Sequence, residues 1–195
     1  MRRAVLLAVG ALVVAGGALA GIVLTRDSGV AAGPLACRSC GVNGLAFPVD
    51  PDEPFTYGLL TLRNPGPNPA VLDQVVPLEA TRGLRLLGEV ALRTRDNPWN
   101  ITASDHHHFP PPNVRSVARP VRGYRIAPMK GRREEHEIML GFTVPGPGTF
   151  GFRRLAVEYH VGSTRYRAVF DFRFRVCAPA KLHHDDCEPP MDHPE

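Results

Sequence analysis

Three consecutive histidines, His106 to His108, are the side chains whose type and spacing most favour metal chemistry in this sequence. In an extended segment His106 and His108 point to the same side, so both imidazoles can reach one ion. Asp105 adds a carboxylate, and imidazole together with carboxylate suits Cu²⁺ or Zn²⁺. His106 and His108 are therefore candidate metal ligands, although a solvated loop that binds no metal is the favoured interpretation.

Further potential metal ligands lie in the C-terminal tail, which contains His183, His184, Asp185, Asp186 and His193. Consecutive histidines lack the i, i+4 spacing that forms a metal site on one helix. Only folding could therefore bring the tail beside the histidine loop.

The four cysteines form two pairs that flank the predicted domain: Cys37, Cys40, Cys177 and Cys187. An even number of cysteines in an exported chain indicates disulfides, and four cysteines allow three connectivities. We expect bridges across the domain, which would close a loop of about 140 residues and stabilise the fold by roughly 4–5 kcal/mol. Local bridges within each pair are the alternative.

The first pair also has the spacing of a CxxC motif. A thioredoxin-like site needs a helix that begins at the motif and lowers the pKa of the first thiol, but Gly41-Val42-Asn43-Gly44 follows here. A four-thiolate zinc site usually needs a second CxxC, whereas the second pair is ten residues apart. Redox catalysis and a four-cysteine zinc site are both disfavoured.

Motifs of nucleophilic or hydrolytic catalysis are absent from the sequence, including GxSxG, SxxK and HExxH. Residues 146–151 formally match GxGxxG, but Pro147 removes an N–H group and the flanking patterns are both typical of strands. This segment is interpreted as a hairpin turn. The sequence therefore predicts a non-enzymatic protein without a cofactor.

The cellular compartment is indicated by the apolar segment from Ala4 to Leu24, which carries no charge. As a helix it would be about 31 Å long, close to the hydrocarbon thickness of a bilayer. Two arginines precede it, whereas Arg26 behind it is offset by an acidic residue, so the positive-inside bias places the N-terminus in the cytoplasm. Residues 1–26 are predicted to be a single-pass signal anchor in the cell membrane, with the remaining chain extracytoplasmic.

A cleaved signal peptide is the alternative to an anchor. Gly16 and Gly17 would end the helix, and Ala18-Leu19-Ala20 resembles a small-residue cleavage site. Cleavage there would leave an apolar new terminus, which favours the uncleaved anchor. Both interpretations place residues 27–195 outside the cytoplasm.

Charge is unevenly distributed over the exported part. The formal net charge of the whole chain is +4, but the arginines beside the apolar segment account for most of it. Residues 115–133 contain seven basic side chains and no acidic one, whereas five acidic side chains and one lysine follow Cys177. The compartment argues against nucleic acid. A basic surface could instead meet anionic lipid or an acidic envelope polymer, or simply be solvated.

Alternating apolar residues separated by Pro/Gly turns predict β-strands. The expected strands cover residues 42–49, 55–63, 70–78, 84–93, a segment near 117–126, 138–144, 155–161 and 165–176. Gly162 and Ser163 predict a two-residue hairpin turn before the last strand. In that strand apolar residues from Tyr166 to Val176 alternate with mostly charged ones, which is typical of a strand with one buried face.

Seven or eight short strands predict an all-β fold, an antiparallel immunoglobulin-like β-sandwich preceded by one transmembrane helix. The expected organisation is a linker at 27–36, an extracytoplasmic sandwich at 37–177 and an acidic, histidine-containing tail at 178–195. The long loop from Arg95 to Asn113 is a candidate contact surface, as is the basic stretch at 115–133.

The sequence thus predicts a membrane-anchored binding module whose partner is a protein or another component of the cell envelope. The alternative is an extracytoplasmic protein that binds copper or zinc through His106, His108 and the tail histidines.

Overall fold

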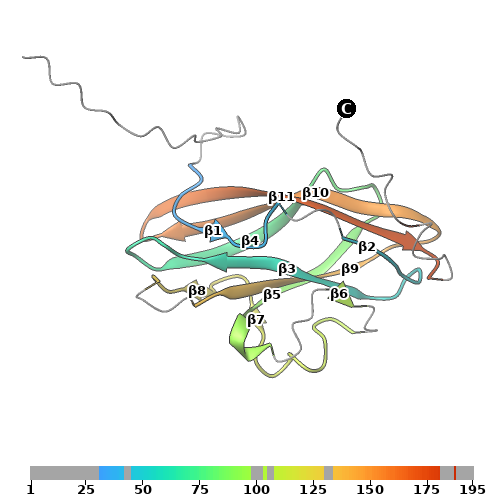
Figure 1. Cartoon of the computed structure of the whole chain (residues 1–195), viewed down its shortest axis with the longest axis horizontal. Helices are drawn as coiled ribbons and strands as arrows, with labels where there is room; N and C mark the ends of the chain where they lie inside the picture. Colours follow the sequence, from blue (N-terminus) through green and yellow to red (C-terminus); the bar gives the residue numbers. More distant parts are fainter. Residues whose placement is uncertain are drawn as a thin grey trace, which may run out of the picture.

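The computed structural model describes residues 31–41, 45–97, 103–104, 108–129, 134–180 and 187. This part of the chain forms two curled β-sheets (Figure 1). A short 3-10 helix, η1 (Thr94–Asp96), follows β5. The described residues contain no helix long and apolar enough to cross a membrane. The predicted anchor at residues 1–26 lies outside them.

Sheet A has the strand order β1-β3-β9-β5-β7, and β6 also pairs with β3. The strands are β1 (Ala36–Cys37), β3 (Phe55–Arg63), β9 (His136–Thr143), β5 (Arg85–Arg93), β7 (Arg119–Pro120) and β6 (Ala103–Ser104). All of these pairings are antiparallel.

Sheet B has the order β2-β11-β10-β4-β8. The strands are β2 (Leu45–Pro48), β11 (Thr164–Ala178), β10 (Gly148–Val161), β4 (Ala70–Leu78) and β8 (Arg125–Ile126). Only the β2–β11 pairing is parallel among them. Val161 pairs with Thr164, which confirms the two-residue turn at Gly162 and Ser163.

The longer predicted strands are present, but the single strand expected near 117–126 is wrong. That segment contains two short strands, β7 in sheet A and β8 in sheet B. Pro120 has no N–H group to continue the first one. Gly123 then adopts a positive φ of 82°, which turns the chain toward the other sheet.

The core lies between the two sheets and is rich in aromatic rings. Phe174 of sheet B has its ring centroid 4.8 Å from that of Tyr57 and 6.1 Å from that of Phe142, both in sheet A. The alternation predicted for the last strand is confirmed, since Phe172, Phe174 and Val176 are buried while Arg173 between them is exposed. The inward-facing side chains of β11 therefore pack against sheet A and hold the two sheets together.

The outer face of sheet A is covered by a second, smaller apolar cluster. Leu92, Met139 and Val114 are buried in it, and Phe109 packs against it. The ring of Phe109 lies directly over Gly141, and a methyl group at that position would overlap it. The chain that connects β5 to β9 is thereby held against the sheet.

This contact yields a first prediction. Gly141→Ala should destabilise the fold by about 1–3 kcal/mol, because a new methyl group must displace the Phe109 ring. Urea unfolding followed by circular dichroism measures the change. Gly146→Ala is the control, since no atom lies within 4 Å of its added Cβ, and it should change stability by less than about 0.5 kcal/mol. A Gly141→Ala protein as stable as the wild type would contradict the packing.

Candidate functional site

The cysteines form two local disulfides, Cys37–Cys40 and Cys177–Cys187, with Cα–Cα distances of 5.5 and 5.6 Å. The expected bridges across the domain are therefore wrong. The N–H of Gly41 donates to the carbonyl of Asp171, which places the first pair about six residues before Cys177 along β11. Six residues of strand span about 20 Å, whereas the Cα atoms of a disulfide lie within about 7 Å.

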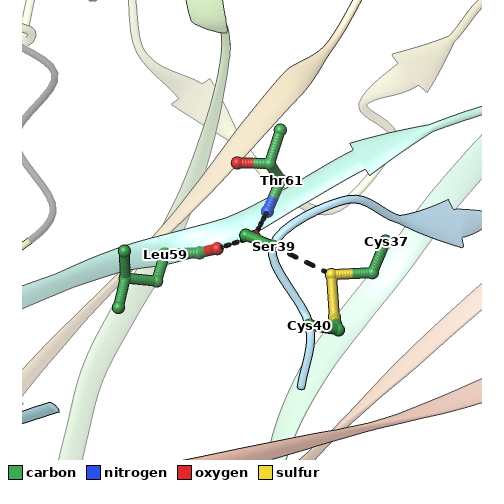
Figure 2. Close-up of a disulfide and its surroundings, with 5 residues drawn as sticks. All are labelled: Cys37, Ser39, Cys40, Leu59 and Thr61. Atoms are coloured by element: carbon green, nitrogen blue, oxygen red, sulfur yellow. Dashed lines mark hydrogen bonds between the residues drawn. A yellow bond between two sulfur atoms is a disulfide. The ribbon is translucent and has the colours of Figure 1, made fainter. Parts of the chain in front are cut away.

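The turn that contains the first disulfide covers an exposed edge of β3 (Figure 2). The N–H of Arg38 donates to the carbonyl of Thr61 at 3.0 Å. The hydroxyl of Ser39 donates to the carbonyl of Leu59 and accepts from the N–H of Thr61 at 3.2 Å. Because β1 ends at Cys37, Ser39 satisfies backbone groups of β3 that a longer neighbouring strand would normally pair.

The disulfide itself faces the core side of this turn. Cys37 is the register partner of Leu62, which is fully buried, and both cysteines pack against the main core. Immediately after Cys40 the chain leaves sheet A and hydrogen-bonds to β11 of sheet B. This position supports a structural role, in which the disulfide fixes the crossing between the two sheets.

The second disulfide ties the tail to the opposite end of β11. Cys177 and Cys187 form a small buried cluster with Ala46 of β2. The disulfide sulfur Sγ of Cys187 lies 3.6 Å from the carbonyl oxygen of Phe47. The predicted tail, residues 178–195, is therefore joined to the sandwich at residue 187.

A cavity of about 360 Å³ opens on the outer face of sheet A, beside the first disulfide turn. It is lined by Arg38, Ser39, Gly58, Leu59, Thr61, Thr94, Glu135 and Glu137. Arg38 donates from one nitrogen to both carboxylate oxygens of Glu135 at 2.9 Å. Glu135 is thus neutralised by its partner, which leaves Glu137 as the other carboxyl group of the cavity.

Glu137 is only 3% exposed, and its Oε2 accepts a hydrogen bond of 2.8 Å from the Asn97 side chain. Burial raises the pKa of Glu137 to about 7, although the hydrogen bond from Asn97 acts in the opposite direction. The neighbouring His136 is also buried, and burial lowers its pKa. The edge of this cavity therefore holds a carboxyl group that changes its charge near neutral pH.

A second cavity, of about 390 Å³, lies on sheet B and is rich in arginine. Its lining residues are Asp73, Gln74, Arg122, Glu158, Tyr159, Arg165, Tyr166 and Arg167. Glu158 accepts a 2.7 Å hydrogen bond from Gln74 and lies 3.6 Å from Arg167 Nε. Arg122 and Arg165 are exposed and form no ion pair with any described residue. The cavity can therefore attract an anion.

The structure does not bring the predicted metal ligands together within its described part. His108 is exposed, and His106 and the tail histidines lie outside the described residues. No group of three or more His, Cys, Asp or Glu side chains among the described residues could hold a metal ion. The metal site at His106 and His108 stays a prediction, which native mass spectrometry with Cu²⁺ or Zn²⁺ and a His106→Ala/His108→Ala variant would test.

Sequence reasoning missed the most perturbed carboxyl group. Glu137 lies in the charged run from Glu134 to Glu137, where alternation in β9 predicts an outward and hence solvated side chain. Its carboxyl group is hydrogen-bonded to Asn97, which lies forty residues earlier, just after η1. No local signal in the sequence indicates that contact.

Comparisons with known proteins do not assign a family. No protein-family model and no curated protein matches the sequence. Among the solved structures that match is that of the VesB protease of Vibrio cholerae, with 8% identity and a TM-score of 0.36. The match covers 74% of this chain but 32% of that one, so this chain spans about a third of its length. A likeness of this size carries no argument about activity.

The disulfide connectivity gives a second prediction. Peptide mapping without reductant should recover Cys37 linked to Cys40 and Cys177 linked to Cys187. Because both rings are small, replacing the first pair by serine should cost about 2 kcal/mol and replacing the second about 3 kcal/mol in urea unfolding. A peptide that links one pair to the other would contradict the local bridges.

Glu137 gives a third prediction. Burial raises its folded-state pKa to about 7, above the ordinary value of about 4.5 for a glutamate. The protonated carboxyl group therefore stabilises the fold fully below about pH 4.5. That contribution, at most about 3 kcal/mol, should be lost as the pH rises to 7. Glu137→Gln should remove this part of the pH dependence, measured by urea unfolding between pH 4 and 8.

The Glu137→Gln profile must be compared with that of the wild type, because His136 also makes stability depend on pH. Burial lowers the pKa of His136, so its protonation lowers the free energy of unfolding as the pH falls, which is opposite to the effect of Glu137. Asp171→Asn, which removes an exposed carboxyl group of β11, is the control and should follow the wild type. Identical pH profiles for Glu137→Gln and the wild type would rule out the buried carboxyl as the source.

Proposed function

We propose that this chain is a non-enzymatic, single-pass membrane-anchored, extracytoplasmic β-sandwich that binds a protein or another component of the cell envelope. The order β1-β3-β9-β5 in one sheet and β11-β10-β4 in the other supports an immunoglobulin-like topology. It matches the ABED and GFC sheets of constant-type immunoglobulin domains, with a parallel β2 added beside the last strand. The two disulfides are in keeping with an oxidising compartment.

The observation that carries this proposal is the support beneath the connection between β5 and β9. Val114 is fully buried, and Phe109 of the same connection covers Gly141. The N–H groups of Val117 and Ala118 donate to the carbonyl of Val114, which fixes the turn around it. A long connection that builds its own packed cluster is frequently a binding element held in place by the scaffold.

The packed turn presents a compact polar surface. Asn113 and Arg115 flank the buried Val114, and both are exposed. Arg119 donates to the carbonyl oxygens of Ser116 and Ala118, so its side chain braces the same turn. These residues lie where the predicted loop and the predicted basic stretch meet, which favours this surface for partner contact.

A fourth prediction follows for the full-length protein. Asn113→Ala/Arg115→Glu should reduce recovery of the partner by at least tenfold in crosslinking and co-purification from membranes, because both substitutions alter the exposed surface without touching Val114. Arg153→Glu/Arg173→Glu changes two exposed arginines of sheet B and should recover the partner at wild-type level. Equal recovery with the loop variant, or no saturable partner with the wild type, would contradict the proposal.

A further inference from the structure

The described chain begins with a segment that is bound to sheet B. The carbonyl of Ala31 accepts a 3.0 Å hydrogen bond from the N–H of Arg167. The hydroxyl of Tyr159 donates to the carbonyl of Ala32 at 2.7 Å and accepts from the N–H of Leu35 at 3.1 Å. Half of the predicted linker at 27–36 is thus part of the packed domain.

This segment docks at one particular end of the sandwich. We call it the hairpin end, because it contains the turn at Gly162 and Ser163, and Arg167 lies five residues after Gly162 in the chain. At the other end of the same strand Ala178 pairs with Gly148. Eleven residues of strand, or about 36 Å, separate the two positions. Figure 1 shows the described chain beginning at the left of the sandwich, with the arrow of β11 pointing to the right.

The length of the intervening chain fixes how far the hairpin end can lie from the proposed anchor. Only six residues separate Leu24 from Ala31. Fully extended, they reach about 20–25 Å. If the apolar segment stays in the membrane, as the proposed function requires, the hairpin end faces the lipid surface at short range.

Exposed arginines gather at this end from two separate parts of the chain. Arg122 and Arg125 lie near the start of β4, because Gly123 donates to Leu72 and Arg125 pairs with Val71. Arg165 is the second residue of β11. None of the three forms an ion pair with a described residue.

Three carboxylates lie near these arginines, namely Asp73 and Glu158 of the same cavity and Glu89, which is attracted by the charge of Arg122 and accepts from the N–H of Val75. Asp73 lies 3.2 Å from His160 Nδ1. Glu158 accepts from Gln74 and lies near Arg167. With Arg167 included, four arginines lie at the hairpin end against the three carboxylates Asp73, Glu89 and Glu158, so a net positive charge remains.

We propose that Arg122, Arg125 and Arg165 dock the hairpin end onto anionic lipid headgroups of the membrane that anchors the chain. This inference rests on the proposed anchor. Phosphate groups match the guanidinium donors of arginine, and the attraction acts within a Debye length of about 8 Å at physiological salt. Docking orients the sandwich, so that the tail bridge at Cys177 and Cys187 lies at the end remote from the membrane.

The fifth prediction tests this docking with the full-length chain in lipid nanodiscs. One set contains phosphatidylcholine alone, and the other contains 30% phosphatidylglycerol. Hydrogen exchange of the backbone amides at 121–126 and 162–166 should slow at least threefold in the anionic discs, and the difference should disappear in high salt. Arg122→Glu/Arg165→Glu should abolish the difference, whereas Arg153→Glu/Arg173→Glu, an equal change of charge elsewhere on sheet B, should preserve it.

The outcomes separate this inference from the proposed function. A chain that fails to co-elute with the discs, or whose intact mass lacks residues 1–20, overturns the anchor and the docking together. A chain that co-elutes but exchanges equally in both discs overturns the docking alone. Glycerol phosphate added to the neutral discs is the last arm, and protection by this soluble anion would identify a small-anion site in place of lipid docking.

Discussion

The fold depends on one short segment that belongs to both sheets. Residues 36–37 pair with β3 in sheet A, and a few residues later the chain hydrogen-bonds to β11 and continues as the parallel strand β2 of sheet B. One edge of each sheet is therefore formed by the same stretch of backbone. The Cys37–Cys40 disulfide lies at the crossing, so it fixes the side of the sandwich where both sheets would otherwise end in unpaired strands.

The opposite side of the sandwich is also closed by one segment, because β7 pairs with β5 of sheet A and β8, five residues later, pairs with β4 of sheet B. A polar contact joins the sheets on this side as well. Glu89 of β5 accepts a 2.6 Å hydrogen bond from the N–H of Val75 in β4. The Glu89 carboxylate thus satisfies the N–H of Val75 at the edge of sheet B, and this hydrogen bond links the two sheets. Burial raises the pKa of Glu89, while this hydrogen bond and the charge of Arg122 lower it. Both sides therefore have a segment that crosses between the sheets, reinforced by a disulfide on one side and by the Glu89 hydrogen bond on the other.

Much of this architecture could be predicted from alternation and turn residues. The bounds of β3 and β4 match the expected 55–63 and 70–78, because their apolar residues alternate and proline or glycine follows. The cysteine pairing could not be predicted, since spacing does not reveal that β2 runs parallel to β11. The buried Glu137 was missed because its hydrogen-bond partner, Asn97, lies forty residues earlier, and the metal site stays a prediction because His106 lies outside the described residues.

The local disulfides bear on how the protein is made. If the chain crosses the membrane in order from its proposed anchor toward its C-terminus, Cys37 and Cys40 emerge within three residues of each other, well before the last strand. Their bridge can close without waiting for β11, and Cys177 later needs only a cysteine ten residues away. Each bridge therefore forms from neighbours in the order of translocation, so that correct pairing requires little help from a disulfide isomerase.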